Sequence, residues 1–156
     1  DTVQEMTTLA ADTYERELIY GLRSHVIVRE TEAEARAAAE QLVSKLDAGS
    51  GDAIRKKSLD ATSFGVARQA ALRDKAGDDG FVEENLWTGV GRARSGAGAA
   101  IVGNPDQVAA KLRAYQNVGI GAFILSGYTH AAECDLFAEH VLPQIDHAPL
   151  KPRFRH

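Results

Sequence analysis

The chain has 156 residues, of which 44% are hydrophobic and 26% charged, with a formal net charge of −4. This composition is typical of a folded domain and excludes a disordered tail, while 18 Lys and Arg well mixed with 22 Asp and Glu give no broad footprint for nucleic acid. The sequence contains neither a run of about 18 apolar residues nor a secretory signal pattern, so no membrane contact and a cytoplasmic location are expected.

The amino-terminal quarter predicts a helix, a strand and a second helix. A helix of moderate quality is expected over 3–14, and the branched apolar residues that follow favour a buried strand over 20–28. Thr31 and Glu34 have the spacing of a capping box and precede a helical apolar stripe. Because the first residue is Asp1 and not Met, we expect the sequence to start inside a longer chain or after processing.

Between 47 and 98 the pattern weakens, because three Gly-rich or acidic breaks surround one expected helix over 59–73. We interpret 47–98 as a mobile insertion, of the kind that serves as a lid or binding loop. Trp87, the only tryptophan, is expected to anchor this insertion to the body of the protein.

Order returns with an expected strand over 99–103. Asn104-Pro105 then begins a helix that Gly119 can end, and a buried strand over 121–126 precedes a last helix and an irregular tail over 147–156. Apolar strands that each precede an amphipathic helix predict an α/β fold with a parallel sheet, forming a single domain over 1–156.

Arg23 and His25 are the first candidate site residues. They lie two apart on a predicted strand, so both side chains face the same side and can meet one anionic group. A buried polar pair satisfied by backbone or by a carboxylate explains the same residue types equally well. Both interpretations stay open on the residues alone.

Two further candidates lie beside the later strands. Arg94 stands in a Gly-rich stretch whose backbone amides could close over an anion, although a flexible surface loop is the simpler reading. Tyr128 follows the last strand, where its hydroxyl could donate to a developing negative charge, or where its ring could simply pack over the sheet rim.

The remaining His and Cys residues are assigned structural roles. No metal site is expected, because the histidines lack partners at ligand spacing and Cys134 is the only cysteine, which also excludes an internal disulfide. Cys134 is not proposed as a nucleophile. The residues covered by this interpretation are His130, His140, His147 and Cys134.

Three segments together resemble a known family. GLRSHVIVRETEAEA at 21–35, NLWTGVGRARSGAGAAIVGNP at 85–105 and GAFILSGYTH at 121–130 are similar, in order and spacing, to the carboxyl-terminal half of the alkanesulfonate branch of bacterial luciferase-like flavin-dependent monooxygenases. The resemblance covers roughly 20–145. It implies strands six to eight of a TIM (β/α)8 barrel, with a long insertion before the penultimate strand.

The resemblance also implies a reaction. Reduced FMN, supplied by a separate NAD(P)H-dependent flavin reductase, and O2 would oxidise an alkanesulfonate or related small molecule to an aldehyde and sulfite. By motif, Arg23, His25, Arg94 and Tyr128 would be catalytic, the arginines holding the sulfonate or oxygenated flavin and His25 orienting or moving a proton. Ser126, Gly127 and Tyr128 would contact the flavin.

Two substitutions and the length depart from the family pattern. Thr129 stands where the family commonly has Pro, and Ser24 replaces a usual apolar residue, so another sulfonate, sulfone or unrelated substrate stays open. A TIM barrel takes about 250 residues. The isolated chain is therefore expected to be inactive and to need an amino-terminal half or a homo-oligomeric partner. A luciferase-like oxidoreductase using a deazaflavin, or a non-catalytic truncated assembly module, is the alternative.

Overall fold

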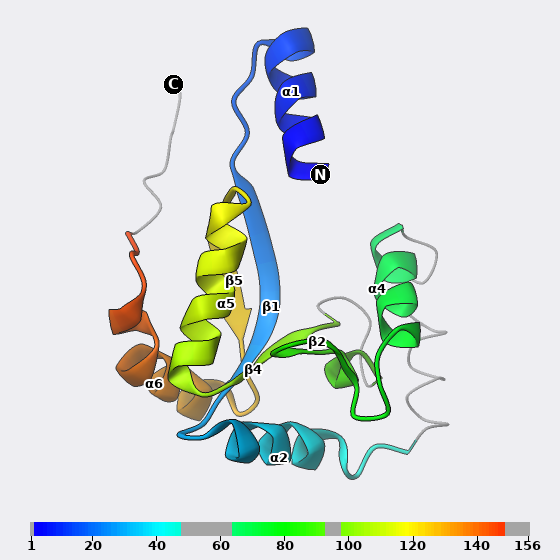
Figure 1. Ribbon diagram of the computed structural model, residues 1–156, viewed down its shortest axis with the longest axis vertical. Helices are drawn as coiled ribbons and strands as arrows, with labels where there is room; N and C mark the ends of the chain where they lie inside the picture. Colours follow the sequence, from blue (N-terminus) through cyan, green and yellow to red (C-terminus); the bar gives the residue numbers. More distant parts are fainter. Residues whose placement is uncertain (1, 48–63, 93–97, 149–156) are drawn as a thin grey trace.

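The computed structural model describes residues 2–47, 64–92 and 98–148 (Figure 1). Its helices are α1 (Thr2–Tyr14), α2 (Glu32–Val43), α4 (Phe64–Asp74), α5 (Pro105–Asn117) and α6 (His130–His140), with 3-10 turns η1 (Gly89–Arg92) and η2 (Leu142–Gln144). Its strands are β1 (Tyr20–Val28), β2 (Phe81–Glu83), β3 (Leu86–Trp87), β4 (Ala100–Gly103) and β5 (Ile120–Ser126).

The strands form one mixed sheet in the order β2-β3-β4-β1-β5. β1 pairs in parallel with both β4 and β5, whereas β3 is antiparallel to both β2 and β4. The α/β class expected from the sequence is therefore confirmed, with an antiparallel hairpin added. The carboxyl ends of the three parallel strands lie at one edge of the sheet, the place where side chains of α/β proteins commonly converge on a ligand.

The strand order differs from three consecutive barrel strands, which would put β4 between β1 and β5. Instead β1 lies in the middle, because the short β4 has β3 on its other edge while β1 offers β5 six paired positions from Tyr20 to His25. Within the described residues the sheet is open, with β5 at its edge. The assignment of β1, β4 and β5 as strands six to eight of a TIM barrel therefore stays a prediction.

The β2–β3 hairpin lies inside the segment that the sequence presented as an excursion. Asn85 turns the hairpin at a φ of 61°, and its side chain donates a 2.9 Å hydrogen bond to the carbonyl of Val102 in β4. Trp87 is 3% exposed and packs in the core, and its indole N–H donates to the carbonyl of Asp79. Strands of two and three residues are too short to show a period of two, so the pattern predicted none of them.

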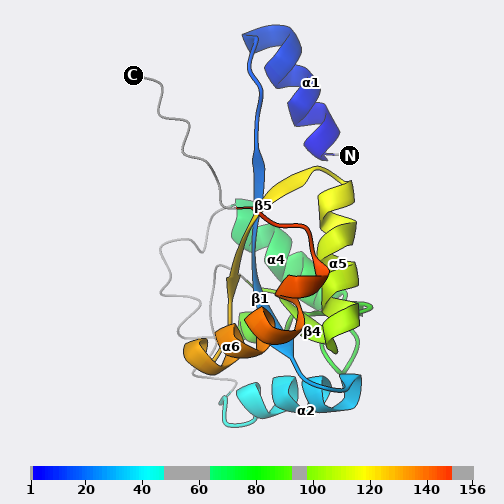
Figure 2. The same cartoon turned by 90° about the vertical axis from the view of Figure 1, so that its left-hand side faces the viewer.

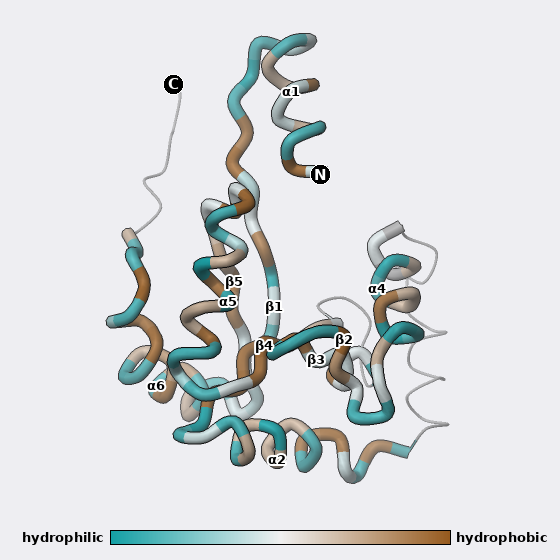
Figure 3. Tube along the Cα trace, viewed as in Figure 1, coloured by the Kyte–Doolittle hydropathy of each residue, from teal (hydrophilic) through white to brown (hydrophobic). Residues whose placement is uncertain are grey.

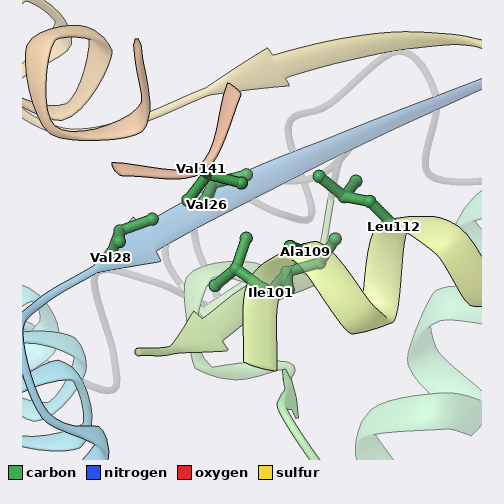
Figure 4. Close-up of a cluster of buried hydrophobic side chains, with 7 residues drawn as sticks. Val26, Val28, Ile101, Ala109, Leu112 and Val141 are labelled. Carbon is green, nitrogen blue, oxygen red and sulfur yellow. The ribbon is translucent and has the colours of Figure 1, made fainter. Parts of the chain in front are cut away.

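Hydrophobic side chains cover both faces of the sheet. One cluster lies between β1, β4 and α5 and includes the even-numbered β1 residues Val26 and Val28 (Figure 4). The other contains the alternate residue Ile27 with Ala35 and Ala39 of α2 and the hairpin residue Trp87. α5 lies to one side of β1, while α2 crosses near the carboxyl end of that strand (Figures 1 and 2). This two-sided burial explains the continuous apolar run of β1.

The predicted helix ends are confirmed where they can be compared. α2 begins with the Thr31–Glu34 capping box, and Asn104 forms a second capping box with Gln107 before Pro105. Gly119, just after α5, has a φ of +97°, which a residue with a Cβ adopts only under strain. The expected helix over 59–73 corresponds to α4, which is described from Phe64 onward; residues 149–156 of the expected tail lie outside the described residues.

α1 stands away from the sheet (Figure 1), and hydrophobic residues occur along it (Figure 3). Leu9 is 56% exposed and Tyr14 64% exposed, and Ile19 at the entry to β1 is 64% exposed. Among the described residues, no helix combines the length and apolar character needed to cross a bilayer. The exposed side chains therefore mark a surface that a folded protein usually covers with other protein.

Candidate active site

His25 and Tyr128 come together at the carboxyl edge of the sheet. The register between β1 and β5 sets His25 opposite Ser126, so the loop after β5 starts beside His25. The rings of His25 and Tyr128 are stacked, with centroids 5.2 Å apart and planes inclined by 22°. His25 is 5% exposed whereas Tyr128 is 37% exposed, so the tyrosine covers the imidazole and keeps its own surface accessible.

Arg23 lies on the same face of β1, two residues before His25, as the alternation of a strand requires. It is exposed, and it is opposite Ile124 of β5, which is itself 65% exposed. The guanidinium therefore lies on an open, partly apolar face. This arrangement leaves Arg23 free to approach a ligand that is brought against the sheet.

His130 lies beside the two rings, although from the sequence it was expected to have only a structural role. Its ring centroid lies 5.9 Å from that of Tyr128, with the planes tilted by 60°. The three rings form a row from β1 across the loop to the start of α6. The useful signal in the sequence was the position of His130 two residues after Tyr128, in the loop that leaves a strand end.

Ser126 and Gly127 connect β5 to this row. Ser126 is half-buried in the strand opposite His25, and Gly127 is buried against α6. A Cβ on Gly127 would lie 2.3 Å from the Cβ of Glu133, so no larger residue fits without displacing the helix. The peptide bond between Tyr128 and Thr129 is cis.

An ion pair that sequence reasoning missed lies directly below this loop. Arg29 Nη2 donates to Glu133 Oε1 over 2.7 Å, and the Glu133 side chain is 6% exposed. Arg29, Glu133 and Tyr128 line one cavity of about 190 Å³, together with Ile27 and α2 residues. Arg23 and His25 do not line that cavity. The two residues gave no sequence signal because they are 104 positions apart.

Among the described residues, His140, His147 and Cys134 do not join the site. Arg94 lies outside the described residues, so its predicted role stays a prediction. His140, His147 and Cys134 are exposed, and no group of three His, Cys, Asp or Glu residues within the described ranges has the arrangement of a metal site. A polar cavity of about 560 Å³ lies elsewhere, between α2 and the hairpin, and includes Asp79 and Trp87.

A row of rings at a strand-end edge, with an arginine on the same sheet face, describes a site for a flat or anionic ligand. The model of the luciferase-like monooxygenase family matches residues 2–122, and the chain belongs to this family. The family resemblance found in the sequence motifs is thereby confirmed. Members of the family generally use reduced flavin.

Two relatives carry the same name. The chain is 66% identical over 150 residues to sulfoquinovose monooxygenase of Novosphingobium aromaticivorans, covering 96% of this chain and 41% of that protein. It is 55% identical over 135 residues to sulfoquinovose monooxygenase of Agrobacterium fabrum, covering 86% and 35% respectively. The chain thus spans less than half the length of these relatives.

Proposed function

We propose that this chain contributes the carboxyl-terminal part of a flavin-dependent monooxygenase that removes sulfite from a sulfonated sugar. The substrate class follows from the two relatives, both named for sulfoquinovose, in place of the simple alkanesulfonate suggested by the motifs. The observation that carries the proposal is the stacked pair His25 and Tyr128, with Arg23 on the same sheet face. Such a donor set suits both the sulfonate and the hydroxyl groups of a sugar.

The residues present fit one side of a flavin site. The half-exposed Tyr128 ring offers a flat surface, with the His130 ring tilted by 60° beside it, and Ser126 at the end of β5 supplies a hydroxyl donor. We propose FMN as the flavin. When bound in reduced form, it supplies the two electrons with which O2 is activated.

The chain's own side chains have three tasks in this proposal. Arg23 binds the sulfonate as a planar, permanently charged fork. Tyr128 donates its hydroxyl hydrogen to negative charge that develops during the reaction. His25, held between the sheet and the Tyr128 ring, accepts or donates a proton at its imidazole. In this scheme Arg94 provides a second positive charge that binds the sulfonate.

Activity of the whole protein is proposed for a complete barrel, with a separate NAD(P)H-dependent flavin reductase as its partner. The test is a chimera in which this chain replaces the matching 41% of the Novosphingobium relative. With reductase, FMN and O2 we expect sulfite release from sulfoquinovose. Sulfite from simple alkanesulfonates alone would move the substrate back to that class, and a folded chimera that neither binds reduced flavin nor releases sulfite would favour an assembly module.

Replacing Tyr128 in the chimera tests its hydroxyl. Tyr128→Phe keeps the ring that stacks on His25 and removes only the donor, so kcat should fall about 10²- to 10³-fold, the cost of losing one donor to developing charge. Stopped-flow and steady-state sulfite assays measure the effect. Tyr14→Phe, on the exposed face of α1, is the matched control and should leave kcat unchanged. An equal loss in both variants would contradict the role of Tyr128.

A further inference from the structure

Glu133 carries a buried carboxylate that the proposed reaction does not use. The residue is 7% exposed, and one of its oxygens, Oε1, accepts the 2.7 Å hydrogen bond from Arg29. The other oxygen, Oε2, has no hydrogen-bond partner within the described structure. A charge buried with incomplete pairing is costly, so its presence indicates a task other than general stability.

Arg29 connects this carboxylate to the end of β1. Its Nη1 donates to the carbonyl of Val28, the last residue of β1, over 2.5 Å, while Nη2 donates to Glu133. One guanidinium therefore ties the first turn of α6 to the strand that carries His25. Because the fork is rigid, the two bonds fix the direction of the connection as well as its length.

The loop with Tyr128 is held by Glu133 on both sides of the tyrosine. Before it, Gly127 is so close to the Glu133 side chain that an added Cβ would lie 2.3 Å from the Glu133 Cβ. After it, the backbone N–H of Glu133 donates to the carbonyl of Thr129 over 3.1 Å. Glu133 therefore contacts the loop on both sides of Tyr128.

Packing alone does not hold the Tyr128 ring. The cavity of about 190 Å³ that Tyr128 shares with Arg29 and Glu133 leaves open space beside the ring, and the residue is 37% exposed. A ring with space on one side can leave its partner unless its backbone is fixed.

We propose that Arg29 and Glu133 form a positioning pair, which holds the 127–129 loop so that Tyr128 stays stacked on His25. The pair acts through Tyr128 and touches no reacting group. This inference rests on the proposed function for its effect on turnover, but its effect on the ring stack is independent of any activity.

The test uses the chimera with ¹³C-labelled histidine, in which His25→Gln identifies the His25 ring resonance. Glu133→Gln, which keeps the side-chain volume, should shift that resonance in the direction that Tyr128→Leu shifts it. It should also lower kcat about tenfold to hundredfold, as misplacement of a reacting group does, with KM changed less than about twofold. Glu139→Gln, on the exposed side of the same helix, is the matched control and should change neither.

Arg29→Met removes the same ion pair from its more exposed side. If the two residues act as a unit, its resonance shift should match that of Glu133→Gln, and the double variant should shift no further. The inference is overturned if the folded Glu133→Gln variant leaves the His25 resonance unchanged. It is also overturned if the resonance shift in the double variant equals the sum of the shifts in the two single variants. If Glu133→Gln does not fold, the shift of the His25 resonance in Arg29→Met tests the inference instead. An unsubstituted chimera without sulfite release counts against the proposed function only.

Discussion

Single contacts at the end of β5 show how one residue type can decide the geometry of the site. Gly127 lies where the loop that carries Tyr128 passes closest to α6. A side chain there would have to move Glu133, and with it the ion pair to Arg29. The glycine is therefore required by a close approach, without any unusual backbone angle.

Substituting this glycine should destabilise the protein. Gly127→Ala forces a carbon into a distance of 2.3 Å from Glu133, so we expect a loss of about 1–3 kcal/mol in the free energy of unfolding. Urea denaturation of the chimera measures it. Gly21→Ala in β1 is the control, because its added carbon would meet nothing closer than 3.7 Å. Equal losses at the two positions would show that steric contact with Glu133 is not the cause.

At the scale of elements, the amino-terminal ends of α2 and α5 are joined by side chains. Gln107 donates a 2.6 Å hydrogen bond to Glu32, which also accepts from Arg36 over 2.8 Å. These bonds, Gln107 first, lower the pKa of Glu32 below its ordinary value of 4.5. The carboxylate also lies in the first turn of α2, where negative charge favours the helix.

The lowered pKa predicts the pH dependence of this link. Because the folded form holds the carboxylate better than the unfolded chain does, the contribution of Glu32 is complete above about pH 5.5 and is lost as pH falls through 4.5 and below. The urea midpoint of Glu32→Gln should therefore lie below that of the parent at pH 7 and approach it at pH 3. Glu40→Gln, exposed on the same helix, is the control. A difference that stays constant with pH would contradict the assignment.

At the scale of the whole molecule, the open sheet leaves apolar side chains exposed. β5 forms one edge, and Ile124 in it is 65% exposed beside Arg23 on the face that carries His25. α1 adds further exposed apolar residues above the sheet (Figure 3). Since open edges and exposed apolar faces favour association, this face is where we expect the rest of a barrel to pack.

A negative charge introduced on that face should weaken assembly with the rest of the barrel while leaving the folding of the chain nearly unchanged. Ile124→Glu should change the free energy of unfolding, measured with urea, by only about 0.5 kcal/mol or less, because the side chain is already exposed. Co-expressed with the unmatched part of the Novosphingobium relative, the variant should be recovered in complex less often than the parent chain, as measured by size-exclusion chromatography. Val118→Glu, which is 49% exposed just after α5, is the control. Equal recovery of the Ile124 variant and the parent would show that this face does not bind the remaining barrel.

The sequence by itself determined the bounds of β1, both capped helices and the family. Each of these depends on neighbours along the chain: the apolar run of 20–28, the spacing of Thr31 to Glu34, and the three family motifs within 21–130. Local patterns of this kind can be recognised in the sequence alone because the interacting groups are a few residues apart.

Only the tertiary structure decided which strands are neighbours and which side chains share the site. The antiparallel hairpin occupies one edge of β4, so β5 pairs with β1, and that pairing brings Tyr128 onto His25 and Glu133 onto Arg29. His130 joined the site for the same reason. Contacts between residues about a hundred positions apart depend on which strands pair at each sheet edge and on how the helices pack. The spacing of residues along the chain predicts neither of these.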